Sequence, residues 1–417
     1  MYEWNETQKM IQTMVRQFVE REVKPNVDAL EHGDMPPYDI LRKMIRTFGM
    51  DQVAKERFDK QIAREEAAAR GETIEKKEKS GGGGNPLAAE GAAMSTIPII
   101  ELCRYCPGMV TAMGVSVGLT GTTIMSKGTI EQKKRWGLDL LTLAKVGAWA
   151  ITEPDSGSDA FGAMKATARP TDDGQWLLNG NKTFITNGPY ADTMVFYCKL
   201  DDGVTPHDQR KVIAFVLDKG TPGLEQTKPM RKMGIHSSPT GELFLSDVKV
   251  GDDRLLGGRA SLESRAGKES AKETFTMERT GVAAMALGII EQCIQLSVEY
   301  AKTRKSWGKP IGEYQLIQAK LAMMEVHRLN VQNLVFRYIE MSAAGKSLSL
   351  GDASVMKLYS ARAAVEVALE AVQLFGGNGY MAEYRVEQLA RDAKILQIYA
   401  GTDEMQIQAI AKEMLRR

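Results

Sequence analysis

Residues 146–255 constrain the fold most, because short β-favouring segments replace the helical periodicity found on either side. Turn-forming pairs such as Asn179-Gly180 and Asn187-Gly188 separate several of these segments. We therefore expect a small antiparallel, β-barrel-like domain here. The segments expected as strands are 148–151, 176–178, 184–186, 193–197, 212–217 and 243–250.

The flanking regions have the spacing of amphipathic helices. Met10, Met14 and Phe18 recur at helical intervals, and the run Val23-Lys24-Pro25 predicts a break because proline cannot continue a helix. After residue 276 the apolar surface is wide enough for the centre of a bundle or a subunit interface. We expect a mainly α fold with a central β domain. It divides into an N-terminal helical domain (1–145), the β domain (146–255) and a C-terminal four-helix bundle (256–417).

Two stretches depart from this regular layout. Residues 54–85 are highly charged and end in a run of four glycines, which predicts an exposed helix followed by a flexible loop. Residues 257–272 are also charged and predict a linker. Each stretch is either solvated surface or a structure that reshapes the entrance of a binding site.

The composition excludes several classes of protein. Among 417 residues, Lys and Arg number 54 and Asp and Glu 53, so the formal net charge of +1 argues against nucleic-acid binding through phosphate neutralisation. Four scattered cysteines indicate a reducing compartment rather than a disulfide framework. The four histidines do not cluster in sequence, so we expect no metal site.

Neither the start of the chain nor its one apolar stretch predicts membrane association. The first residues lack a basic flank followed by an apolar run, and Glu101 and Arg104 interrupt the apolar stretch 95–125. We expect a cytoplasmic protein, or one of the mitochondrial matrix if the source is eukaryotic.

Four segments together resemble the acyl-CoA dehydrogenase family over nearly the whole chain. Taken alone, each has an ordinary structural explanation, such as a glycine turn or a helix stop. Their order and the helix–sheet–helix layout make the match specific. The segments are WAITEPDSGSD (149–159), KTFITNG (182–188), ER (278–279) with RKSWGKP (304–310), and QLFGGNGY (373–380) with RDAK (391–394) and IYAGT (398–402).

The resemblance implies FAD as cofactor. Arg304 is similar to a family arginine that pairs with the FAD diphosphate, for which a bidentate guanidinium is suited. Aromatic and hydroxyl groups of the β segments would line the flavin. The cofactor-binding residues implied are Trp149, Ile151, Thr152, Ser158, Phe184, Ile185, Thr186, Arg304, Ser306, Trp307, Gln315, Gln373, Leu374, Phe375, Gly376, Gly377, Thr402 and Glu404.

The reaction implied is α,β-dehydrogenation of an acyl-CoA thioester to the trans-2-enoyl-CoA. It needs a carboxylate in an apolar pocket to take the α-proton. Many family members carry that Glu where this chain has Ala400, whereas a branch resembling isovaleryl-CoA and long-chain dehydrogenases places it where this chain has Glu278. Glu278 is therefore the expected base. It could instead favour a helix N-terminus, and Asp403 and Glu404 are other nearby carboxylates.

Substrate contacts follow from the same resemblance. Gly401 could donate its backbone N–H to the thioester carbonyl and so stabilise the developing enolate. The substrate-binding residues implied are Ser158, Thr276, Arg279 and Gly401.

The family also implies partners. Some cofactor contacts reach the FAD of a neighbouring subunit, which predicts a homotetramer built as a dimer of dimers, and electrons would pass to an electron-transfer flavoprotein. Two alternatives stay open: a catalytically silent subunit of a hetero-oligomer, and a flavin oxidase or monooxygenase of the same fold.

Overall fold

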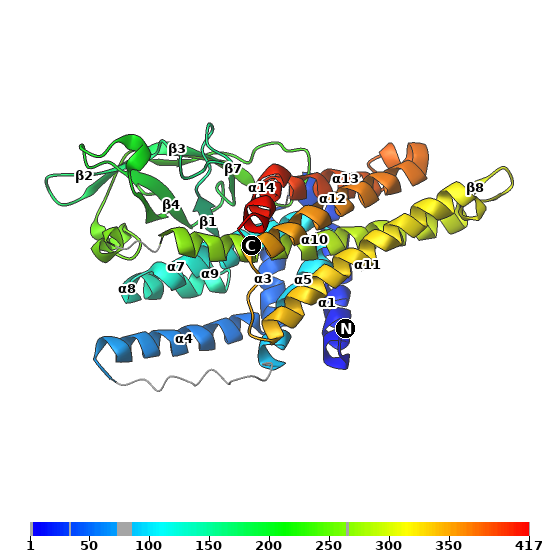
Figure 1. Cartoon of the computed structure of the whole chain (residues 1–417), viewed down its shortest axis with the longest axis horizontal. Helices are drawn as coiled ribbons and strands as arrows, with labels where there is room; N and C mark the ends of the chain where they lie inside the picture. Colours follow the sequence, from blue (N-terminus) through cyan, green and yellow to red (C-terminus); the bar gives the residue numbers. More distant parts are fainter. Residues whose placement is uncertain (1–2, 33–34, 73–85, 264–266, 417) are drawn as a thin grey trace.

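The computed structural model describes residues 3–32, 35–72, 86–263 and 267–416, without the side chains of 86–90 and 267–277. A sheet domain lies at one end of the long axis and long helices extend to the other end (Figure 1). The chain is mostly helical, with helical domains on both sides of the sheet in sequence, as expected.

The N-terminal region is a series of helices. Asn5 begins the first with a capping box, in which its side chain accepts from the N–H of Gln8 and its own N–H donates to the Gln8 side chain. The expected break at Val23-Lys24-Pro25 is wrong: the backbone stays helical and changes its winding. Pro25 lies in the first turn of a 3-10 segment, where its missing N–H is not needed. The elements are α1 (Glu6–Phe18), η1 (Val19–Val23), η2 (Lys24–Asn26), α2 (Val27–His32), α3 (Tyr38–Thr47), α4 (Met50–Ala69), α5 (Pro86–Cys103), α6 (Pro107–Met113), η3 (Gly114–Gly121), α7 (Thr122–Lys127), α8 (Ile130–Gln132), η4 (Lys133–Gly137) and α9 (Leu138–Leu141).

The sheet differs from the expected antiparallel, barrel-like domain. β4 pairs in parallel with β1 and β2 and antiparallel with β5, so the sheet is mixed. Among the described residues its path ends at β1 and β6 without closing into a barrel. The strands are β1 (Gly147–Ala150), β2 (Thr167–Pro170), β3 (Trp176–Thr186), β4 (Thr193–Leu200), β5 (Val212–Asp218), β6 (Leu224–Gln226) and β7 (Thr240–Val250), with η5 (His207–Gln209) between β4 and β5.

Asn179-Gly180 was expected to form a turn, and this prediction is wrong because the pair lies inside β3. The pairing of β3 with β7 shifts register between Leu178 and Gly180, so the glycine marks a bulge. Gly180 has φ +143, and a Cβ there would lie 2.5 Å from that of Ala166. The residue therefore allows two backbones to approach closely.

The C-terminal region contains the longest helices. α10 contacts α11, α12 and α5, and its buried residues include Val282, Ala286 and Ile290, so the wide apolar surface lies inside the helical domain. α10 begins within the stretch expected as a linker. The elements are η6 (Asp252–Arg254), η7 (Arg259–Leu262), α10 (Gly267–Thr303), β8 (Lys305–Ser306), β9 (Lys309–Pro310), η8 (Ile311–Glu313), α11 (Gln315–Ala343), α12 (Leu350–Phe375), η9 (Gly376–Tyr380), α13 (Val386–Lys394), η10 (Ile395–Gln397) and α14 (Asp403–Met414).

The charged stretch after residue 53 forms much of α4, which packs on the other N-terminal helices. Phe58 and Ile62 are buried against Met125, and Glu65 pairs with Lys133 at 2.7 Å. The flexible loop expected in this stretch includes residues 73–85, which lie outside the described residues.

Two stretches, Pro107–Lys127 and Glu278–Thr303, are long and apolar enough to cross a membrane. More than half of each is buried within the protein, so packing inside the fold accounts for their apolar character.

We expect opposite effects from adding one methyl group at two glycines of α10. In Gly288→Ala the new Cβ would collide with the carbonyl oxygen of Ile100 on α5, so unfolding should become easier by about 1–3 kcal/mol. Gly281 has nothing within 4 Å of its Cβ position, and Gly281→Ala should stabilise the helix by about 0.5–1 kcal/mol. Thermal unfolding measures both; equal shifts would contradict the α5–α10 packing.

Candidate functional site

A buried ion pair holds together the segments that carry the first group of expected cofactor residues. Lys182 Nζ donates to Glu153 Oε1 at 2.8 Å and to the carbonyl of Ile151 at 3.1 Å. The other contacts of the Glu153 carboxylate are to the N–H groups of Lys165 and Ala166, at 2.5 and 3.0 Å. One carboxylate thus closes the loop 153–166, and the N–H of Thr183 donates to the carbonyl of Thr152 at 2.9 Å. Residues 151–153 and 182–183 are fixed against each other.

Phe184 and Trp149 project differently from these strands. Phe184 is 65% exposed and has φ 57, because β3 shifts register between Lys182 and Ile185 and turns this side chain outward. The Trp149 indole N–H donates to the Tyr197 hydroxyl at 3.1 Å, and their rings meet edge to face. An exposed aromatic ring at a strained backbone position is typical of a ligand-binding surface.

Glu278, Arg279 and Gly401 meet where α10 faces the turn before α14. A Cβ built on Gly401 would lie 3.8 Å from Arg279 Nη2, and Arg279 Nη1 donates to Ser354 Oγ of α12 at 2.8 Å. Glu278 is half-buried, and its surroundings raise the pKa of its carboxyl to about 7 through burial, against the opposing effect of the Arg279 and Lys357 cations. A carboxyl with such a pKa can exchange a proton near neutral pH.

Lys357 belongs to the same polar cluster and was not predicted. Its side chain is fully buried, and its Nζ lies 3.6 Å from Asp403 Oδ1, while Arg362 pairs with the other carboxylate oxygen of Asp403 at 3.0 Å. Burial lowers the pKa of Lys357. A lysine on the buried face of α12, four residues after Ala353, was the available signal.

The buried polar atoms around this cluster are not all satisfied within the described part of the chain. Arg279 Nε, Lys357 Nζ, Asp403 Oδ1 and Gln406 Oε1 have no hydrogen-bond partner there. Buried polar groups are normally paired, so water or a bound polar molecule is expected to complete the cluster.

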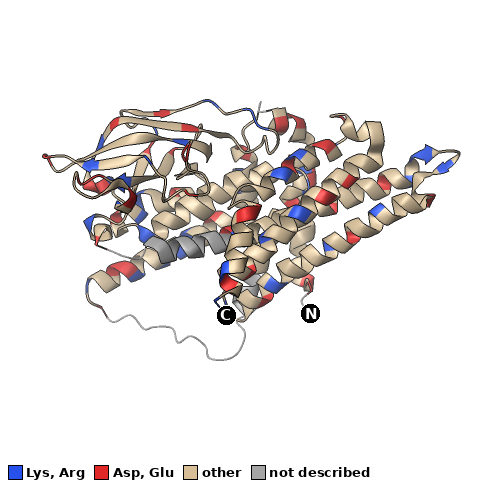
Figure 2. Cartoon of the chain, turned by 45° about the horizontal axis from the view of Figure 1, so that its top comes forward, with Lys and Arg blue, Asp and Glu red and all other residues tan. Residues whose placement is uncertain are grey.

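A second group of expected cofactor residues lies at the opposite end of the helical domain. β8 and β9 form a hairpin beyond α10, and Figure 2 shows basic residues near its tip. Glu278 and Arg304 are separated by about 39 Å along the helix axis, at 1.5 Å per residue. Within one chain the two groups therefore do not meet. The exposed or half-buried members are Arg304, Ser306, Trp307, Gln315, Gln373, Gly376 and Gly377.

The other expected residues differ in which of their atoms a ligand could contact. The side chains of Ile185, Leu374 and Phe375 are buried in the hydrophobic core, so only their backbone is available to a ligand. Ser158 and Glu404 are exposed, and Thr402 caps α14 by accepting from the N–H of Met405 at 3.4 Å. The side chain of Thr276 lies outside the described residues.

Family comparison gives the class to which this architecture belongs. The family model for the N-terminal domain of acyl-CoA dehydrogenases matches residues 5–51 and 41–143. The model for the middle domain matches 148–248, and that for the C-terminal domain matches 265–415. The chain belongs to the acyl-CoA dehydrogenase family, and it is an oxidoreductase.

Individual proteins agree with this assignment. The short-chain specific acyl-CoA dehydrogenase of Megasphaera elsdenii is 39% identical over 340 residues, which covers 81% of this chain and 85% of the relative. The solved butyryl-CoA dehydrogenase of the same organism superimposes with a TM-score of 0.82 at 32% identity and covers both chains fully. A chain in the solved structure of the electron transferring flavoprotein of Acidaminococcus fermentans matches with a TM-score of 0.80 at 31% identity over both full chains.

FAD is the cofactor of this family, and the residues present fit it. An acyl-CoA dehydrogenase solved with FAD from Bacillus anthracis matches with a TM-score of 0.79 at 26% identity, covering 99% of this chain and 68% of that one. In this chain Phe184 and Trp307 are exposed aromatics at positive φ. Gly376 and Gly377 leave open space where a Cβ would stand, so a ligand can approach the backbone beside them.

We expect Glu153→Gln to destabilise the protein and weaken FAD retention, because it leaves the Lys182 charge buried without a counter-charge. Breaking a buried pair costs about 3–5 kcal/mol. Asp155→Asn removes the carboxylate of an exposed pair with Lys165 in the same loop and should change little. Thermal unfolding and release of flavin fluorescence test both variants; equal effects would show that the buried pair does not hold the loop.

Proposed function

We propose that the protein oxidises an acyl-CoA thioester to the trans-2-enoyl-CoA, with Glu278 taking the α-proton. The observation that carries the proposal is the Glu278 carboxyl itself, half-buried beside Arg279 and the turn at Gly401, with the small Ala400 next to that turn. Because an acyl α-proton is weakly acidic, the base must be desolvated, and burial of Glu278 meets that requirement.

The charges around Glu278 fit a base that must also lose its proton between turnovers. Burial alone would favour the protonated acid, whereas Arg279 and Lys357 favour the carboxylate. The balance leaves the pKa of Glu278 at about 7, so both forms are populated at neutral pH.

Gly401 and Arg279 are suited to position the thioester. Gly401 has φ 83, which glycine adopts without strain, and its N–H is the donor that we assign to the thioester carbonyl. Ser354 accepts from Arg279 Nη1 and so fixes the guanidinium beside this turn. Ser158 and Thr276 are further candidates for substrate contact.

FAD, when bound, supplies a hydride acceptor for the β-hydrogen. We assign its flavin end to Trp149, Thr152, the backbone of Ile151 and the strand 184–186, with Thr402 and Glu404 at the edge. We assign its diphosphate to a second chain's Arg304 group, because these two groups lie far apart within one chain.

The same separation supports a homo-oligomer, and we propose a homotetramer arranged as a dimer of dimers. An electron-transfer flavoprotein is the proposed electron acceptor, and the match to a chain from such a system in A. fermentans supports it. We also propose a cytoplasmic location.

The acyl group is suggested by the residue next to the turn at Gly401. The small Ala400 leaves room near the reacting carbons, which favours a branched, long or cyclic acyl group.

The proposed base is tested by mixing purified holoenzyme anaerobically with a panel of acyl-CoAs and following flavin absorbance. We expect Glu278→Gln to slow bleaching about 10²–10⁴-fold, the usual contribution of a general base. Glu404→Gln is the matched comparison, because Glu404 is an exposed carboxylate in the first turn of α14. A loss only in Glu404→Gln would move the base there, and no bleaching of the wild type by any acyl-CoA would favour a silent subunit.

The pH dependence follows from the pKa of Glu278. The base must be ionised, so the rate of flavin reduction should be lost as pH falls through about 7 and should be full above it. Lys357→Met removes a cation that lowers this pKa, so the profile should shift to higher pH, whereas Lys357→Arg keeps the charge and should shift it less. Stopped-flow reduction rates across pH give the midpoints, and identical midpoints in all three proteins would exclude an effect of Lys357.

A further inference from the structure

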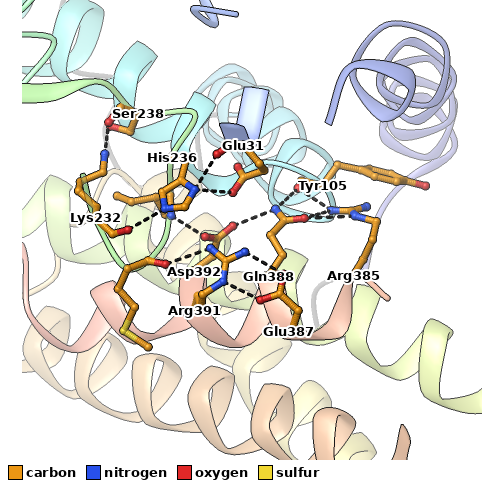
Figure 3. Close-up of polar contacts among 12 residues, drawn as sticks. Glu31, Tyr105, Lys232, His236, Ser238, Arg385, Glu387, Gln388, Arg391 and Asp392 are labelled. Carbon is orange, nitrogen blue, oxygen red and sulfur yellow. Dashed lines mark hydrogen bonds and ion pairs between the residues drawn. The ribbon is translucent and has the colours of Figure 1, made fainter. Parts of the chain in front are cut away.

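A buried polar junction joins the three domains away from the base. Figure 3 shows it between α2, the loop from β6 to β7, and α13. Asp392 Oδ1 accepts from the N–H of Ile235 at 2.5 Å, and Gln388 links Asp392 to the carbonyl of Tyr105 by bonds of 3.1 and 2.9 Å. On the other side of the loop, His236 reaches Glu31. We call these residues, with Lys232 and Arg391, the junction.

His236 is bound in a way that requires two N–H donors. Its Nδ1 lies 2.6 Å from the carbonyl oxygen of Glu31, and its Nε2 lies 2.7 Å from that of Lys232. A carbonyl oxygen only accepts, and a neutral imidazole has a single N–H. Both contacts are therefore satisfied only by the doubly protonated, positively charged ring.

Asp392 faces the ring from α13 and can balance this cation. The Glu31 carboxyl lies 3.8 Å from Nδ1. Lys232, in the same loop, and Arg391, which donates to the carbonyl of Met233 at 3.0 Å, are the nearby cations. Burial and the Asp392 charge raise the pKa of Glu31 to about 8, and burial lowers that of Lys232 to about 8.

The loop that carries His236 connects both sides of the proposed site. At its C-terminal end the carbonyl of Pro239 accepts from the N–H of Asn187 at 2.7 Å, and Thr240 pairs with Thr186 of the flavin-side strand. At its centre a Cβ on Gly234 would lie 2.6 Å from the backbone of Arg391. Helix α13 then leads through η10 to the turn at Gly401.

We propose that His236, held as an imidazolium between the carbonyls of Glu31 and Lys232, is a positioning residue that fixes the flavin-side strand relative to the thioester-side turn. The kinetic part of this inference rests on the proposed acyl-CoA oxidation. The expected effect of His236 on FAD retention does not rest on that reaction, because FAD is the cofactor of the family.

The test compares His236→Gln with His236→Arg in the full-length holoenzyme. Gln has only its amide NH₂ as donor and no charge, whereas Arg keeps a permanent charge and donates along several directions. The His236 side chain is 30% exposed, which leaves room for the longer arginine. His207→Gln changes an exposed histidine on the β4–β5 connection and is the matched control.

We expect His236→Gln to slow flavin reduction by acyl-CoA about tenfold or more and to speed FAD release, as loss of a charge-assisted hydrogen bond would. KM should change less than the reduction rate. His236→Arg should recover most of both properties, and His207→Gln should match the wild type. Equal losses in the Gln and Arg variants, or none in either, would overturn the proposal. If no acyl-CoA reduces the wild-type flavin, the proposed activity fails, and the FAD-release comparison still decides the role of His236.

Discussion

The close packing of α10 against α5 and α12 is the constraint on which the rest of the structure depends. Gly288 brings α10 against the backbone of α5, and Arg279 is tied to Ser354 of α12. Because a helix has a fixed rise per residue, this packing also sets the distance between Glu278 at one end and Arg304 at the other. One element therefore places both the proposed base and the proposed diphosphate cation.

Polar contacts fix the position of the β-domain segments, as helix packing fixes the position of the helices in the bundle. The Glu153–Lys182 pair fixes the loop beside Thr152, and the junction at His236 fixes the end of β3 relative to α13. The pair is buried and the junction is largely buried, so losing a single partner leaves an uncompensated charge or donor. The two halves of the proposed site are thus aligned by a few directional bonds rather than by apolar contact, which has no direction.

The sequence predicted the helix–sheet–helix order because that order depends on local periodicity and turn residues. It predicted an antiparallel, barrel-like sheet where the observed sheet is mixed and open, and it missed the bulge at Gly180, since both depend on which distant strand lies alongside. The resemblance named Glu278 and Arg279, but the pKa of Glu278 is raised by burial and held down in part by Lys357, 79 positions further along the chain. His236 and Glu31 are 205 positions apart, so their contact left no local signal.

The length of α10 has a consequence for mixed assemblies of this chain. If the Arg304 group completes the flavin site of a neighbouring subunit, a defect at Arg304 harms the neighbour and a defect at Glu278 harms the chain that carries it. In an oligomer assembled from both defective chains, some sites would then combine two intact halves. A mutation at Glu278 would therefore impair the subunit that carries it, whereas a mutation at Arg304 would impair the subunit across the interface.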